Sequence, residues 1–203
     1  MKIRRIFSVF LLSVLLAALF LTPQAYALEE PTLDARNALL MDETNGRMLY
    51  GKAEKEKAYP ASITKIMTAL LVLEAVDRGD LSASQPITAS YEAANSIDED
   101  SSTAGIEEGE VLTVEQLLYC LLIVSANEAA NILAEAVSGS VTDFVALMNQ
   151  RATELGCEGT HFANTNGLPD PDHYTTAWDI YLIAREAMKH DLFMTICGSK
   201  SYD

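Results

Sequence analysis

Residues Tyr59–Met67 read YPASITKIM and place a serine and a lysine at the start of a long apolar run. Pro60 favours a chain that turns into a helix start, and we expect a helix from Ser62 to Arg78, ended by a glycine. Positions i and i+3 are neighbours on one face of a helix. The spacing therefore predicts that Ser62 and Lys65 lie side by side in the first turn.

This pairing can support nucleophilic chemistry. A serine hydroxyl is a weak nucleophile until a base accepts its proton, and burial lowers the pKa of a lysine. Lys65 lies in an apolar helix and could act as base or proton relay for Ser62. The first-turn N–H groups would stabilise negative charge nearby. The alternative is that Ser62 caps the helix while Lys65 extends into solvent.

A second polar group, Ser125-Ala126-Asn127, interrupts two apolar segments. A loop between two buried helices can direct a hydroxyl and an amide into a cleft, so Ser125 and Asn127 are candidate site residues. The alternative is a capping box, because Glu128 follows Ser125 by three residues. Capping would explain Ser125 but not Asn127.

The rest of the chain predicts helices and one hairpin. Asn45-Gly46 between two apolar runs indicates a β-hairpin over residues 37–51. Caps and glycine stops predict further helices from Thr113 to the break at Ser125, from there to about Gly139, from Ser140 to Leu155, and from Thr176 to about Lys189. Residues 86–109 are expected to form loops with a short helix, and residues 157–174 a long loop. The fold class is α+β, helix-rich with an N-terminal hairpin.

The N-terminus has the pattern of a secretory signal peptide. Basic residues precede an apolar run over residues 6–21, and Ala25-Tyr26-Ala27 matches an A-x-A cleavage site. We expect cleavage after Ala27, export, and a single domain over residues 28–203. An uncleaved membrane anchor is the alternative, although the run is short of the roughly 20 residues that a span needs.

The composition excludes several classes of partner and cofactor. A formal net charge of −15 disfavours binding to nucleic acid or anionic lipid. The odd number of cysteines argues against a disulfide framework, and the histidines share no ligand spacing. We expect no metal or other cofactor. The residues concerned are Cys120, Cys157, Cys197, His161, His173 and His190.

S-x-x-K followed by S-x-N is typical of penicillin-binding proteins and class A β-lactamases. Over almost all of residues 28–203, the sequence resembles the serine D-alanyl-D-alanine carboxypeptidases, the penicillin-binding proteins of low molecular mass. The resemblance rests on the segments ARNALLMDETNGRMLYGKAEKEKAYPASITKIMTALLVLE, GIEEGEVLTVEQLLYCLLIVSANEAANILAE and ELGCEGTHFANTNGLPDPDHYTTAWDIYLIAREAM. It implies a fold like that of the β-lactamases and DD-peptidases.

The resemblance also implies a function and the roles of four residues. Ser62 would be the nucleophile, and its backbone N–H an oxyanion donor. Lys65 would accept or relay protons, Ser125 would pass protons to the leaving group, and Asn127 would hold the substrate amide. The implied enzyme removes the terminal D-alanine of peptidoglycan stem peptides through a Ser62 acyl-enzyme, and β-lactam antibiotics acylate the same serine. It would act outside the cytoplasmic membrane in cell-wall synthesis and cell shape.

One family motif, K-[TS]-G, is not found in this sequence. The nearest match, Lys200-Ser201-Tyr202, lacks the glycine. In the family this motif lies on a later strand, so we expect a domain that is incomplete at its C-terminus, without those strands or the family's membrane anchor. Two alternatives stay open: an inactive remnant or binding domain, and a class A β-lactamase. The second requires a glutamate after S-x-N, but Glu154 and Glu158 lack its E-x-x-x-N context.

Overall fold

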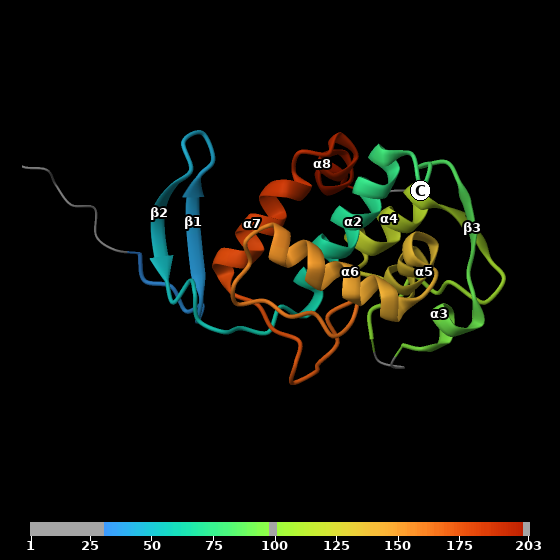
Figure 1. Cartoon of the computed structure of the whole chain (residues 1–203), viewed down its shortest axis with the longest axis horizontal. Helices are drawn as coiled ribbons and strands as arrows, with labels where there is room; N and C mark the ends of the chain where they lie inside the picture. Colours follow the sequence, from blue (N-terminus) through green and yellow to red (C-terminus); the bar gives the residue numbers. More distant parts are fainter. Residues whose placement is uncertain (1–30, 98–100, 201–203) are drawn as a thin grey trace, which may run out of the picture. The chain divides into compact units, whose positions relative to one another are not determined.

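The N-terminal part of the fold is the predicted β-hairpin. The computed structural model describes residues 31–97 and 101–200, so the predicted signal peptide lies outside the described residues. Strands β1 (Ala38–Asp42) and β2 (Arg47–Lys52) pair antiparallel, with an irregularity between Leu40 and Met41 (Figure 1). Gly46 closes the turn at φ +67°, and its N–H donates to the Asp42 carbonyl. The hairpin prediction is confirmed.

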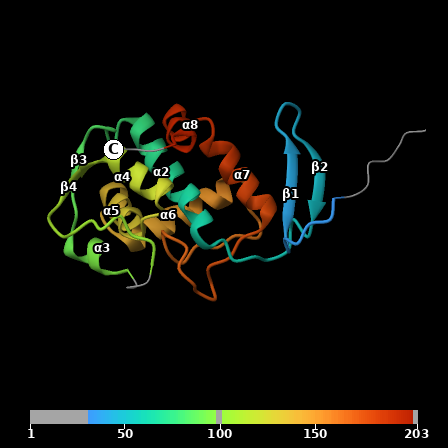
Figure 2. The ribbon, with the colours of Figure 1, turned by 180° about the vertical axis from the view of Figure 1, so that it is seen from behind.

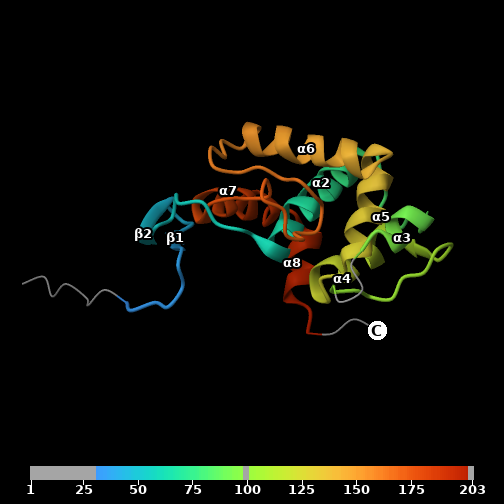
Figure 3. The ribbon, with the colours of Figure 1, turned by 90° about the horizontal axis from the view of Figure 1, so that it is seen from below.

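Helix α2 (Lys65–Arg78) is the central element and ends at Gly79, whose φ is +80°. It lies between α6 (Val141–Glu154) and α8 (Asp191–Gly198) (Figure 3). It also packs on α4 (Val114–Ile123), α5 (Asn127–Ser138) and α7 (Ala177–Ala187). The expected helix started three residues too early, because a 3-10 turn, η1 (Ala61–Thr64), precedes α2. Ala61, the first residue of this turn, has φ +48°, in the left-handed region, and regular α-helical structure begins only after the turn.

The helices around α2 follow the predicted capping signals. Helix α4 (Val114–Ile123) starts at a complete Thr113–Gln116 capping box, and α5 (Asn127–Ser138) ends at Gly139. Ser140 caps α6 (Val141–Glu154), and Thr176 caps α7 (Ala177–Ala187). These helices are confirmed to within about two residues of the predicted ends, the usual uncertainty of helix boundaries.

Three of the four shorter elements, two short strands and α8, were not predicted. Strands β3 (Pro86–Thr88) and β4 (Val111–Thr113) pair antiparallel (Figure 2). The expected short helix is α3 (Tyr91–Asn95), and α8 (Asp191–Gly198) extends the chain beyond the last predicted helix. Strands of three residues carry too few positions to show a period of two.

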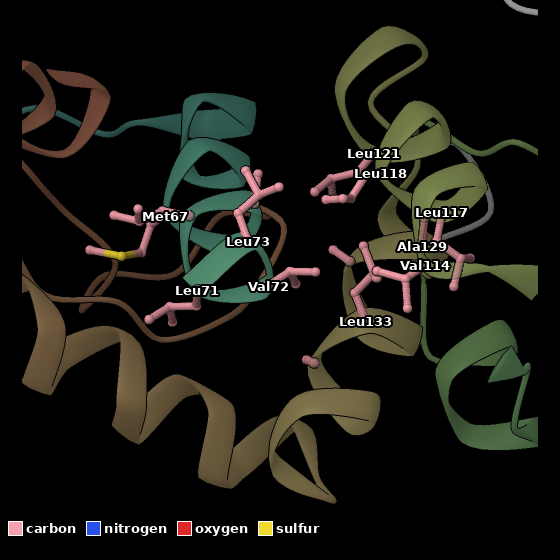
Figure 4. Packing of buried hydrophobic residues seen from close by; sticks show 14 of the residues in the cluster. Met67, Leu71, Val72, Leu73, Val114, Leu117, Leu118, Leu121, Ala129 and Leu133 are labelled. Carbon is pink, nitrogen blue, oxygen red and sulfur yellow. The ribbon is translucent and has the colours of Figure 1, made fainter. Parts of the chain in front are cut away.

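The core is formed mainly by α2, α4 and α5. Figure 4 shows Val72 and Leu73 of α2 facing Leu118 and Leu133 of the other two helices. All four side chains are buried. In the described part of the chain, no single helix is long and apolar enough to span a membrane, and only the bent pair α5 and α6 passes that test jointly. The buried face of α5 belongs to this core.

Candidate active site

The candidate nucleophile lies on a strained turn. Ser62 is in η1, directly after Ala61 with its positive φ. Gly167, at φ +93°, packs against the Ala61–Ser62 peptide so closely that a Cβ there would lie 1.8 Å from the Ala61 carbonyl oxygen. A left-handed alanine is uncommon, and such strain persists only where the surroundings hold it. Ser62 is therefore held from two sides, by its own turn and by the Gly167 backbone.

Lys65 is buried and aimed at this serine. Its side chain is 2% exposed, and Nζ donates to Asn127 Oδ1 at 2.7 Å, to the Asn166 carbonyl at 2.7 Å and to Ser62 Oγ at 3.4 Å. Burial lowers the pKa of Lys65 to about 8, against an opposing effect of Glu128. The alternative of a solvent-exposed lysine is wrong. Because no side-chain cap is formed in η1 or at the start of α2, the capping alternative for Ser62 is wrong as well.

Ser125 occupies the break between α4 and α5 in the left-handed conformation, at φ +60°. Its Oγ is buried without a hydrogen-bond partner among the described residues. The residue at the N-cap position of α5 is Ala126, and no side chain caps this helix. The capping-box alternative for Ser125 is therefore wrong. A buried hydroxyl with no partner is rare.

Asn127 is the first residue of α5 and connects the Ser125–Asn127 segment to Ser62 and Lys65. Its side chain is buried, and its Oδ1 accepts the short hydrogen bond from Lys65 Nζ. Its backbone N–H donates to the Ser102 carbonyl at 2.9 Å. The structure thus brings Asn127, Lys65 and Ser62 into one hydrogen-bonded chain. No hydrogen bond in the described residues joins Ser125 to that chain.

The loop that carries Asn166 was not predicted to be part of the site. Asn164 Oδ1 accepts the Gly167 N–H at 2.7 Å, and Thr68 Oγ1 donates to the Thr165 carbonyl at 2.6 Å. The first bond lies within the loop, and the second fixes the loop on α2. The Asn166 carbonyl between them accepts the hydrogen bond from Lys65 Nζ. The sequence predicted a long loop over residues 157–174, but nothing in it identified the segment against which this loop packs.

The buried His173 is hydrogen-bonded to the last residue of η1, the turn that carries Ser62. Ala163 N–H donates to His173 Nδ1 at 3.1 Å, so the proton of the neutral ring is on Nε2. Nε2 lies 2.7 Å from Thr64 Oγ1 and donates to it. Burial lowers the pKa of His173, which favours this neutral tautomer. The only prediction made for His173 was that it does not bind a metal ion.

A cavity of about 380 Å³ opens beside the nucleophile turn. It is lined by Tyr59–Ala61, Gly167–Pro171 and His173, and its wall includes Ala61, next to Ser62. The described residues contain no group of three or more His, Cys, Asp or Glu that could hold a metal ion. All three cysteines are free thiols. The arrangement offers a nucleophile, a base of lowered pKa and a neighbouring hollow of substrate size.

The sequence matches one protein family over most of its length and is similar to members of that family. Residues 24–202 match the peptidase S11 family, D-alanyl-D-alanine carboxypeptidase. The chain is similar to the D-alanyl-D-alanine carboxypeptidase DacF of Bacillus subtilis, with 36% identity over 97% of this chain and 51% of that protein.

Two solved structures are also similar. D-alanyl-D-alanine carboxypeptidase DacD from Francisella tularensis has a TM-score of 0.81 and 32% identity, over 89% of this chain and 44% of the other. Penicillin binding protein 5 from Haemophilus influenzae has a TM-score of 0.77 and 31% identity, over 80% and 47%. The expected DD-peptidase fold is confirmed. The chain spans about half the length of these relatives.

Proposed function

Because the chain belongs to the D-alanyl-D-alanine carboxypeptidase family, we propose that the protein removes the terminal D-alanine from peptidoglycan stem peptides through an acyl-enzyme on Ser62. The observation that carries the proposal is the contact of a buried lysine of lowered pKa with this serine. A nucleophile within reach of such a base is the arrangement that acyl transfer requires.

The proposed reaction assigns one role to each of the four residues. The neutral amine of Lys65 accepts the proton of Ser62 Oγ, which attacks the carbonyl of the D-Ala-D-Ala bond. The Ser62 N–H stabilises the oxyanion, and Ser125 passes a proton to the departing D-alanine amine. Asn127 holds Lys65 and binds the substrate amide. Water then hydrolyses the ester and restores the serine. Metal or cofactor plays no part in this scheme.

The same serine would accept β-lactams, whose strained amide opens to give a stable ester. The predicted signal peptide supports export, and we place the protein outside the cytoplasmic membrane, where it would act on the cell wall and cell shape. The substrate there is the stem peptide rather than nucleic acid or anionic lipid, in keeping with the net charge of −15.

Acylation by a fluorescent penicillin tests the proposal. We expect the adduct to map by mass spectrometry to Ser62, and Ser62→Ala to abolish both labelling and release of D-alanine from a D-Ala-D-Ala peptide. The exposed Ser84→Ala is the matched control and should label like the wild type. An adduct on another residue, or undiminished labelling of Ser62→Ala, would contradict the proposal.

A further inference from the structure

A further buried ionisable residue, in addition to Lys65 and His173, lies beside the site and has no role in the scheme above. Glu128 is 1% exposed. Its Oε1 accepts hydrogen bonds from Thr103 Oγ1 at 2.7 Å, from the Ala104 N–H at 2.6 Å and from the Ile106 N–H at 3.4 Å. Its Oε2 is buried and has no hydrogen-bond partner in the described part of the chain. A buried carboxylate without a paired cation is costly, so its presence needs an explanation.

The position of Glu128 connects it to the nucleophile. It follows Asn127, which accepts from Lys65 Nζ through its side chain and donates to the Ser102 carbonyl through its backbone. Both residues thus fasten the segment 102–106 to the first turn of α5. In the described residues, no lysine, arginine or histidine nitrogen forms a salt bridge with Glu128.

The charged and titratable groups around this carboxylate come from two other helices. Lys65 of α2 is the cation that interacts with it electrostatically. Glu128 also affects the Cys120 thiol of α4. Burial is the larger cause that raises the pKa of this thiol, and the interaction with Glu128 raises it further. The groups that contact Lys65 itself, Ser62, Asn127 and the Asn166 carbonyl, are uncharged. Glu128 is therefore the counter-charge of Lys65 among the described residues.

We propose that Glu128 is a positioning residue for acylation, whose buried carboxylate stabilises the ammonium that Lys65 becomes when it takes the proton of Ser62. This inference rests on the proposed function. The proton moves from Ser62 Oγ to Lys65 Nζ, and Glu128 forms no bond to the substrate. An opposite charge near an ammonium favours the protonated form. The carboxylate thus makes Lys65 a stronger base. Because Oε2 has no hydrogen-bond partner in the described residues, no donor at that oxygen reduces its negative charge.

Glu128→Gln separates charge from shape. The amide oxygen can keep the three hydrogen bonds made by Oε1, and the NH₂ group takes the place of the unpartnered Oε2. Because burial lowers the pKa of Lys65 to about 8, we expect the acid limb of the wild-type pH profile for penicillin acylation near pH 8. In Glu128→Gln we expect this limb to move to lower pH by about one unit. The rate on the alkaline plateau should fall, because a weaker base assists less.

Two further variants make the test specific. Glu108→Gln removes the same charge from an exposed position and should leave the profile unchanged. Thr103→Val removes one donor to Oε1 but keeps the carboxylate, so it should lower the melting temperature slightly and leave the acid limb in place.

The outcomes distinguish the two proposals. An unmoved acid limb in folded Glu128→Gln overturns the role of Glu128, and so does an equal shift in Thr103→Val, because the position of the segment would then set the profile. Failure of Glu128→Gln to fold also counts against it, since the carboxylate would be structural. A wild-type protein that penicillin does not acylate contradicts the proposed function instead.

Discussion

At the scale of single residues, Lys65 connects the fold to the chemistry. Its burial in α2 makes it a usable base, and two oxygen atoms at 2.7 Å hold its amine near Ser62. These oxygens belong to Asn127 and Asn166, which lie 62 and 101 residues away along the chain. The S-x-x-K spacing predicted the contact with Ser62, whereas the two oxygens depend on how distant segments pack.

Replacing Lys65 by arginine tests the role of its deprotonated form. Arginine keeps the positive charge but cannot be deprotonated in a protein. We expect Lys65→Arg to slow acylation by a fluorescent penicillin by roughly 10²–10⁴-fold, the usual value of general-base assistance. The exposed Lys189, paired with Glu186, provides the control Lys189→Arg, which should react at the wild-type rate. A Lys65→Arg protein within a few-fold of wild type would mean that the lysine only supports the structure.

At the scale of elements, most of the helices were predictable and the site turns were not. The Thr113–Gln116 capping box and the serine and threonine caps of α6 and α7 satisfy backbone groups within a few residues, so local sequence is enough to identify them. The left-handed conformations of Ala61 and Ser125 are different. Neither residue type favours them, and tertiary contacts impose them. The sequence therefore predicted the contact between Ser62 and Lys65 but not the left-handed conformations of Ala61 and Ser125.

The contact between the Gly167 loop and η1 gives a prediction at this scale. Gly167→Ala would put a Cβ 1.8 Å from the Ala61 carbonyl oxygen, so one of the two segments must move. We expect a loss of about 1–3 kcal/mol in the free energy of unfolding. We also expect slower penicillin acylation, because the moved peptide carries the proposed oxyanion donor. Denaturant titration and labelling rates measure the two effects.

Gly109→Ala is the matched control for this contact. Gly109 also has a positive φ, of +83°, but nothing lies within 4 Å of an added Cβ. Its replacement should cost only the backbone strain and leave acylation unchanged. Equal effects of the two substitutions on stability and rate would show that the close approach at Gly167 does not position Ser62.

At the scale of the whole molecule, the helical core and the hairpin differ in how completely they are covered. The core helices bury their large apolar side chains on several sides. The hairpin is a sheet of two strands in the described residues, with β1 packed on α7. Leu40 is 56% exposed, Met48 47% and Leu49 50%. Exposed apolar side chains beside unpaired strand edges promote association between chains.

This difference predicts how residues 28–203 behave after purification. We expect them to bind a hydrophobic dye and to associate as concentration rises, and Leu49→Thr to reduce both effects while the helical circular dichroism stays unchanged. Val111→Thr is the control, because Val111 is 60% exposed on β4, away from the hairpin. Sedimentation velocity over a range of concentrations measures the association. If Val111→Thr reduced it as much as Leu49→Thr, association would follow total exposed apolar surface. A response limited to Leu49→Thr would locate the association on the hairpin rather than on the other two-stranded sheet of the described residues, β3 and β4.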